Sequence, residues 1–169
     1  MTNTFLIFCL MSFQILTVFG SDIFEKISNK TWFEENGFAG VSIVFMKIER
    51  GQIKAIRQIN GSGVPVIATE IYDVEIRQDT IYLLNSSNGQ TNEKPKNDFY
   101  TYNDRQGLLS KGKQLTILFE EPIIYVWTEK RIIMDTRVNV NKLTKISFEK
   151  NEVYINDEIY KIKREDNLK

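Results

Sequence analysis

Carboxylates are the residues of this chain best suited to chemistry, because the sequence contains no histidine and only one cysteine, Cys9. Without histidine the chain lacks the commonest general base and the commonest transition-metal ligand. Ser-His-Asp and Cys-His nucleophilic mechanisms, zinc hydrolysis and di-iron chemistry are therefore excluded. Catalysis by paired carboxylates or by a lysine remains open.

Two carboxylate pairs are the densest in the sequence, Glu120 with Glu121 and Asp73 with Glu75. A glycosidase-like pair must face each other across a cleft. Glu120 and Glu121 are neighbours, and neighbours on a strand point to opposite faces. Asp73 and Glu75 share their face with Arg77, which is typical of a solvated charged surface. We therefore predict a protein that is not an enzyme, and we expect no cofactor and no metal.

Aromatic side chains indicate recognition rather than catalysis. Tyr125 and Trp127 lie two apart on one expected strand and therefore face the same way. Phe99, Tyr100 and Tyr102 follow a long polar segment. Aromatic rings supply a large contact area at low entropic cost, which suits a ligand cavity or a protein-binding patch. Core packing stays open as the alternative, since a small β domain also needs such residues.

The first twenty residues indicate where these side chains act. The run from Phe5 to Phe19 is largely apolar, carries no charge and is followed by Gly20 and Ser21. It is shorter than the roughly 20 residues that a bilayer span needs, which is typical of a secretory signal peptide. We expect a signal peptide at residues 1–20, cleavage before Ser21, and a secreted or periplasmic mature chain without a stable membrane span. An uncleaved anchor is the alternative.

The mature chain, residues 21–169, has the length of a single domain with a core large enough to fold. Cleavage would remove Cys9, so the mature chain could form no disulfide. All 22 basic and 22 acidic residues follow the apolar run, and the two signs alternate along the chain. Nucleic-acid binding relies on clustered Lys and Arg, so we expect no nucleic-acid partner. An anionic membrane surface is disfavoured for the same reason.

The elements that position these residues are expected to be almost entirely strands. Residues Ser21 to Asn36 predict a short helix, which Ser21 or Asp22 would cap. After it, segments rich in Val, Ile, Tyr and Phe recur at about ten-residue spacing between polar or glycine-containing turns. We predict an all-β antiparallel meander of about 8–10 strands that forms a small barrel or a two-sheet sandwich. The expected strands are Gly40–Ile48, Gln52–Ile59, Val66–Arg77, Thr80–Leu84, Gln114–Phe119, Ile123–Thr128, Arg131–Val140, Thr144–Phe148, Glu152–Ile155 and Glu158–Ile162.

A long polar segment, Asn85 to Asp98, interrupts the meander. Loops of this length in a compact domain are uncommon, and they are either functional lids or disordered segments. Nothing apolar lies inside this one to anchor it, which favours disorder.

The stretch Asn29-Lys30-Thr31-Trp32, placed after the expected helix and ahead of the meander, resembles the entrance of lipocalin-like barrels, where Gly-x-Trp leads into the first strand. Here Asn or Lys stands in place of the glycine. The resemblance implies a barrel that takes a small apolar molecule at its mouth and that Trp32 closes at its base as a structural residue. The candidate lining it implies is Tyr72, Val74, Phe119, Tyr125, Trp127 and Met134. A barrel of this size can instead be filled by its own side chains.

These observations predict an exported, non-enzymatic protein that binds a small apolar ligand. Its expected ligand contacts are Tyr72, Phe119, Tyr125, Trp127 and Met134. The alternative is a protein-interaction module, such as an inhibitor of a secreted enzyme or a surface-assembly component. That module would use the Asn85–Asp98 loop with Tyr100 and Tyr102 as its contact.

Overall fold

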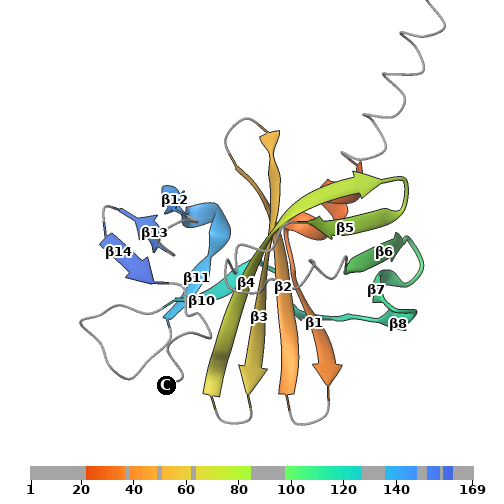
Figure 1. Ribbon diagram of the computed structural model, residues 1–169, viewed down its shortest axis with the longest axis horizontal. Helices are drawn as coiled ribbons and strands as arrows, with labels where there is room; N and C mark the ends of the chain where they lie inside the picture. The colour runs from red at the N-terminus through yellow and green to blue at the C-terminus, as the bar shows by residue number, and fades with distance from the viewer. Residues whose placement is uncertain are drawn as a thin grey trace, which may run out of the picture.

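A computed structural model describes most of the chain after the expected signal peptide (Figure 1). The described residues are 22–36, 39–48, 51–61, 64–84, 98–126, 136–147, 152–156 and 158–161. The expected signal peptide at residues 1–20, Trp127, Met134 and all of the Asn85–Asp98 segment except Asp98 lie outside them. Among the described residues, no helix is both long and apolar enough to cross a membrane.

Nine antiparallel strands form the main sheet, in the order β8-β7-β6-β5-β4-β3-β2-β1-β9. From β1 to β8 each strand pairs with the next one along the chain, which makes the sheet a meander. The strands are β1 (Thr31–Asn36), β2 (Ala39–Lys47), β3 (Ile53–Gly61), β4 (Val64–Arg77), β5 (Thr80–Leu84), β6 (Phe99–Asn103), β7 (Gly107–Ser110), β8 (Lys113–Gln114) and β9 (Thr116–Phe119).

One segment of chain brings the two edges of this sheet together. Strands β8 and β9 are separated only by Leu115, yet β8 pairs with β7 at one edge and β9 pairs with β1 at the other. The sheet is therefore curled into a nearly closed barrel. Closure protects strand edges that would otherwise be free to pair with other chains.

The barrel encloses an inner core. Inward-facing side chains alternate along each strand with outward-facing ones, and a helix at residues 22–28 adds its apolar side to them. The fully or nearly buried members are Ile27, Trp32, Ile43, Phe45, Ala55, Tyr72, Ile81, Leu83, Tyr100, Leu108 and Leu115. Ile23 and Phe24 of the helix are partly buried against this core.

The rest of the chain forms a second layer against the outside of the barrel (Figure 1). A hairpin of β10 (Ile123–Val126) and β11 (Thr136–Asn139) is followed by a sheet of β12 (Lys145–Ser147), β13 (Glu152–Ile155) and β14 (Glu158–Lys161). Their apolar side chains pack on outward-facing residues of β2, β3 and β4. This outer core contains Val44, Ile56, Ile71, Ile124, Val126, Val138, Val140 and Val153.

The helix is shorter than the sequence predicts, because it ends at residue 28 and not at Asn36. Residues 31–36 instead form β1, whose Trp32 enters the inner core while Phe33 points to the other face. Phe33 covers Gly40 of β2 so closely that a methyl group there would lie 2.0 Å from its ring. Pairing with β2 and β9 therefore overrides the helical spacing.

Other boundaries also differ from the expected strands. Residues 99–110 contain β6 and β7, two strands of five and four residues that the sequence analysis did not predict, because such short segments carry little periodic signal. The expected strand Gln114–Phe119 is interrupted at Leu115, where the chain passes from one sheet edge to the other. The described part of Arg131–Val140 ends as a strand at Asn139, because a 3-10 turn begins at Val140.

Candidate functional site

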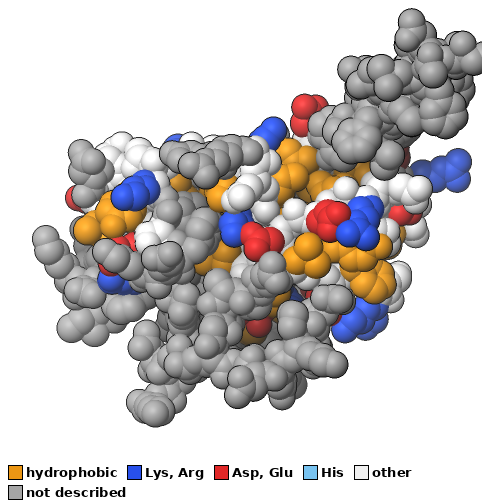
Figure 2. All heavy atoms as spheres, turned by 45° about the horizontal axis from the view of Figure 1, so that its top comes forward, with side chains coloured by type: hydrophobic (Ala, Val, Ile, Leu, Met, Phe, Trp, Pro, Cys, Tyr) orange, Lys and Arg blue, Asp and Glu red, His pale blue; other side chains and the backbone are white. Residues whose placement is uncertain are grey.

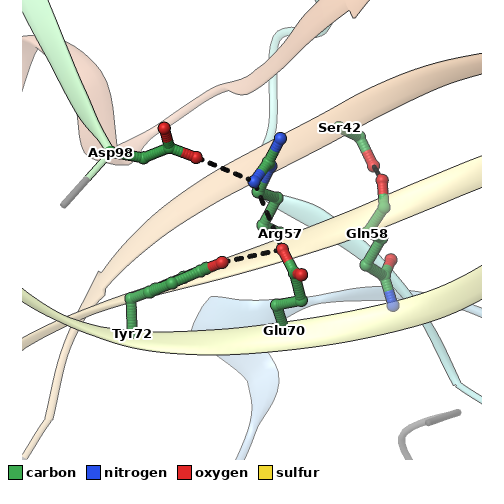
Figure 3. Close-up of polar contacts among 6 residues, drawn as sticks. All are labelled: Ser42, Arg57, Gln58, Glu70, Tyr72 and Asp98. Carbon is green, nitrogen blue, oxygen red and sulfur yellow. Dashed lines mark hydrogen bonds and ion pairs between the residues drawn. The ribbon is translucent and has the colours of Figure 1, made fainter. Parts of the chain in front are cut away.

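A charged cluster lies on the inner face of the barrel (Figure 3). Arg57 is two residues after Ala55 on β3, and Glu70 is two residues before Tyr72 on β4. Ala55 and Tyr72 belong to the inner core, so strand alternation turns Arg57 and Glu70 inward as well. Asp98, just ahead of β6, completes the charged set. We call Arg57, Glu70, Tyr72, Asp98 and Tyr100 the Arg57 cluster.

One nitrogen of Arg57 makes both of its ion pairs. Its Nη1 donates to Glu70 Oε2 at 3.3 Å and to Asp98 Oδ2 at 3.3 Å. Both distances exceed the usual length of a charge-assisted hydrogen bond. The Tyr72 hydroxyl donates to the same Glu70 oxygen at 2.8 Å, which is a normal length. Glu70 is therefore held firmly by Tyr72, whereas Arg57 and Asp98 are held loosely.

Water reaches the charged side chains of this cluster. The exposed fractions of the Arg57, Glu70 and Asp98 side chains are 21%, 22% and 32%. The two ends of β6 place the cluster relative to the helix. Asp98 lies where β6 begins, and Asp104, just after β6 ends, pairs with Lys26 of the helix. The Arg57 cluster is therefore displaced toward the end of the barrel opposite the helix, which we call the Arg57 end.

Two polar groups of the cluster have no partner. The Tyr100 side chain is almost completely buried, with 3% of the residue exposed, and its hydroxyl has no hydrogen-bond partner among the described residues. Arg57 Nε is itself a buried atom, and it has no partner in the described part of the chain. A buried donor without a partner is uncommon, because it loses its hydration without compensation.

Burial and neighbouring charges shift the pKa values of this cluster. Burial, followed by the hydrogen bond to Glu70, raises the pKa of Tyr72 to about 12. Burial also raises the pKa of Tyr100, and the charges of Glu34 and Asp98 add to this rise against the opposing effect of Arg57. Burial lowers the pKa of Arg57, but Tyr100, Glu70 and Tyr72 outweigh it and raise that pKa. Both phenols are therefore neutral and Arg57 is charged near neutral pH.

The structure separates the residues that the sequence proposed as ligand contacts. Tyr72 and Val74 belong to the inner core or pack against it. Phe119 and Tyr125 lie under the guanidinium of Arg137, whose Cζ is 5.1 Å and 5.7 Å from their ring centroids. Phe119 ends β9 of the main sheet and Tyr125 lies on β10 of the outer layer, and neither belongs to the inner core that contains Tyr72. Trp127 and Met134 fall outside the described residues.

The two tyrosines proposed as interaction contacts face the barrel interior. Tyr100 is buried in the inner core, and Tyr102 is partly buried against it with Lys26 Nζ 5.8 Å from its ring. The exposed aromatic side chain beside the long polar segment is Phe99, with 50% of its surface exposed. Its ring centroid is 6.5 Å from that of Tyr82 on the outer face.

Trp32 belongs to the inner core of the barrel and lies against the helix. It is 3% exposed, and its indole Nε1 donates to the backbone oxygen of Ile27 at 3.0 Å. The ammonium of Lys30 lies 5.6 Å from the ring centroid. Trp32 therefore packs the helix against the barrel.

The sequence did not reveal Arg57, Glu70 or Asp98 as site residues. A charged residue at an inward position of an alternating strand was the only signal in the sequence, and which face points inward was unknown until the sheet was seen to curl into a barrel.

The described residues contain no group of three or more side chains that could hold a metal ion. On the face in Figure 2, acidic, basic and hydrophobic side chains are interspersed.

Comparisons with protein-family models, with curated proteins and with solved structures find no match for this chain. The fold itself defines the class: an all-β protein built on a nearly closed antiparallel barrel, with a short helix at residues 22–28.

Proposed function

We propose that this chain is an exported, non-enzymatic protein that binds a small, largely apolar ligand at the Arg57 end of its barrel. The observation that carries the proposal is a contrast within the barrel interior. Most inward-facing side chains form a buried apolar core, whereas Arg57, Glu70 and Asp98 are charged inward-facing side chains that water reaches. The nearly closed antiparallel barrel supports the same function, as does the resemblance of the Trp32 segment to the entrance of lipocalin-like barrels.

The energetic cost of the Arg57 cluster favours binding over a purely structural role. Burying paired charges stabilises a fold less than packing apolar residues of similar size. A barrel that served only as a scaffold would therefore be filled with apolar residues at both ends. Violations of this rule are concentrated at functional sites, where perturbed titrating groups and unpartnered donors are retained for a ligand.

The geometry of the carboxylates supports a non-enzymatic role. Glu70 and Asp98 both contact the same nitrogen of Arg57 at 3.3 Å, so the two carboxylates share a cation, unlike a glycosidase-like pair that faces each other across a cleft. Export is supported by the uncharged apolar run before Ser21.

Mass spectrometry of the protein purified from its native host after export tests this function. Denaturing spectra report the N-terminus, and native spectra of the same sample report anything that is bound. We expect a mature chain that begins at Ser21 and carries a small-molecule adduct. A chain that retains residues 1–20 would contradict export, and a chain without adduct that also fails to take up added apolar probes would contradict ligand binding.

The second candidate is a protein-interaction module, which Phe99 favours. Phe99 and Tyr82 form an exposed aromatic pair beside the long polar segment, and Arg77 lies 5.4 Å from the Tyr82 ring centroid. Shortening residues 88–96 should abolish association with a co-purifying polypeptide if this surface is the contact. The same deletion should leave capture of a small ligand intact if the barrel is the site.

A further inference from the structure

We propose that the ligand of the barrel carries a positively charged amine, which the Arg57 end receives. This inference rests on the proposed function, because it assigns a chemical class to the ligand of that same site. Three observations carry it: the balance of charge, the free hydroxyl of Tyr100 and the loose contact of Asp98.

The interior charge at the Arg57 end is negative. Glu34 is two residues after Trp32 on β1, so it shares the inward face, and it is partly buried. Among the partly buried, inward-facing side chains of the described residues, three are carboxylates: Glu34, Glu70 and Asp98. The single guanidinium of Arg57 stands against them. Lys113 shares this face of the barrel on β8, but it is exposed, so water and salt screen its charge.

The charge balance favours a cation over an acidic ligand. An additional carboxylate or phosphate would face an excess of negative charge in a site where burial weakens screening. An ammonium group would offset that excess. The raised pKa of Tyr100 reports the same field, since Glu34 and Asp98 both contribute to it.

The Tyr100 hydroxyl offers an acceptor for the amine. Only 3% of the Tyr100 residue is exposed, and none of the described residues hydrogen-bonds to its hydroxyl. An ammonium group has only donors, so a phenol oxygen with free lone pairs complements it. The tyrosine ring can also attract a cation through its face.

Asp98 is the carboxylate most able to turn from Arg57 to a ligand. It is the most exposed of the three residues in the ion pairs, and it contacts Arg57 only at 3.3 Å. Glu70, in contrast, also accepts the shorter hydrogen bond from Tyr72. Asp98 and Tyr100 are thus the expected contacts of the amine, while Glu70 positions Arg57.

Calorimetric titration with three probes of equal chain length tests the charge of the ligand: n-octylamine, n-octanol and n-octanoate at neutral pH. We expect n-octylamine to bind at least about tenfold more tightly than n-octanol, and n-octanoate to bind most weakly, because the apolar tails match and the head groups are positive, neutral and negative in turn. Equal or tighter binding of n-octanoate would overturn the amine inference and leave the proposed function standing. Binding of none of the three would contradict the proposed function itself.

Two conservative variants locate the amine. Asp98→Asn should weaken n-octylamine binding about tenfold and change n-octanol binding by less than about twofold, because it removes charge and little volume. Tyr100→Phe should weaken n-octylamine selectively, because it removes only the hydroxyl. The matched control is Glu75→Gln, which removes an outward-facing carboxylate of β4 that pairs with Arg77. Equal losses for n-octylamine and n-octanol in Asp98→Asn and Tyr100→Phe, or an equal loss in the control, would overturn the inference.

Discussion

The side-chain amide of Gln58 holds the backbone of Tyr125 through a pair of hydrogen bonds. Gln58 Nε2 donates to Tyr125 O at 2.9 Å, and Tyr125 N donates to Gln58 Oε1 at 2.8 Å. The amide therefore satisfies the backbone hydrogen-bonding groups of Tyr125 on β10, as the backbone of a neighbouring strand would. Gln58 is adjacent to Arg57, so one strand sends a charged residue into the barrel and an anchoring amide to the outer layer (Figure 3).

Replacing Gln58 with Leu should detach the outer layer. In the wild type the Gln58 amide hydrogen-bonds to the backbone N–H and C=O of Tyr125 and to the hydroxyl of Thr69. The leucine side chain cannot replace any of these bonds. We expect a loss of about 2–4 kcal/mol in the free energy of unfolding. Hydrogen exchange should accelerate more in β10 than in β5. Gln106→Leu, at an exposed turn, should change stability by less than about 0.5 kcal/mol, and an equal loss there would contradict the anchoring role.

Replacing Arg57 with Met should destabilise the protein because Glu70 and Asp98 would lose their shared cation. Breaking a buried ion pair is costly, but partial exposure of these side chains reduces the cost, so we expect a loss of about 1–3 kcal/mol. Chemical denaturation measures it. Arg77→Met, which breaks an exposed pair on the outer face, should have little effect. An Arg57 variant as stable as the Arg77 variant would contradict the structural part of this role.

Replacing Trp32 with Phe should loosen the helix at residues 22–28. The phenyl ring keeps most of the apolar contact but cannot donate to the backbone oxygen of Ile27. We expect a loss of about 1–3 kcal/mol and faster hydrogen exchange in residues 22–28. Lys26→Ala removes the ion pairs with Asp22 and Asp104 and the contact with the Tyr102 ring, all of them near the surface, and should leave exchange nearly unchanged. Slow exchange in the Trp32 variant would show that the indole hydrogen bond does not hold the helix.

The raised pKa of Tyr72 predicts a loss of stability in alkali. The phenol titrates at about 12 in the folded protein and at its ordinary value of 10.0 in the unfolded chain. Its contribution is therefore complete below pH 10 and is lost as the pH rises to about 12. Unfolding measured at intervals over this range should show a steeper loss in the wild type than in Tyr72→Phe. Identical pH profiles would contradict the burial of this hydroxyl.

The all-β class could be read from the sequence because strand alternation is a local property. The period of two in residues 72–77 and the dense polar turns follow from neighbouring residues alone, and they predicted Thr80–Leu84 and Glu152–Ile155 to the residue. Helix and strand were confused at residues 31–36, because long-range pairing with β2 and β9 decided that segment.

The sequence by itself determined the antiparallel meander, the absence of histidine chemistry and the alternation of faces along each strand. Only the tertiary structure decided which face became the interior. Arg57 and Asp98 are 41 positions apart, and Gln58 and Tyr125 are 67 apart, so no local pattern relates them. Their meeting depends on curling of the sheet and docking of the outer layer, because alternation sorts side chains into two faces without saying which face closes inward.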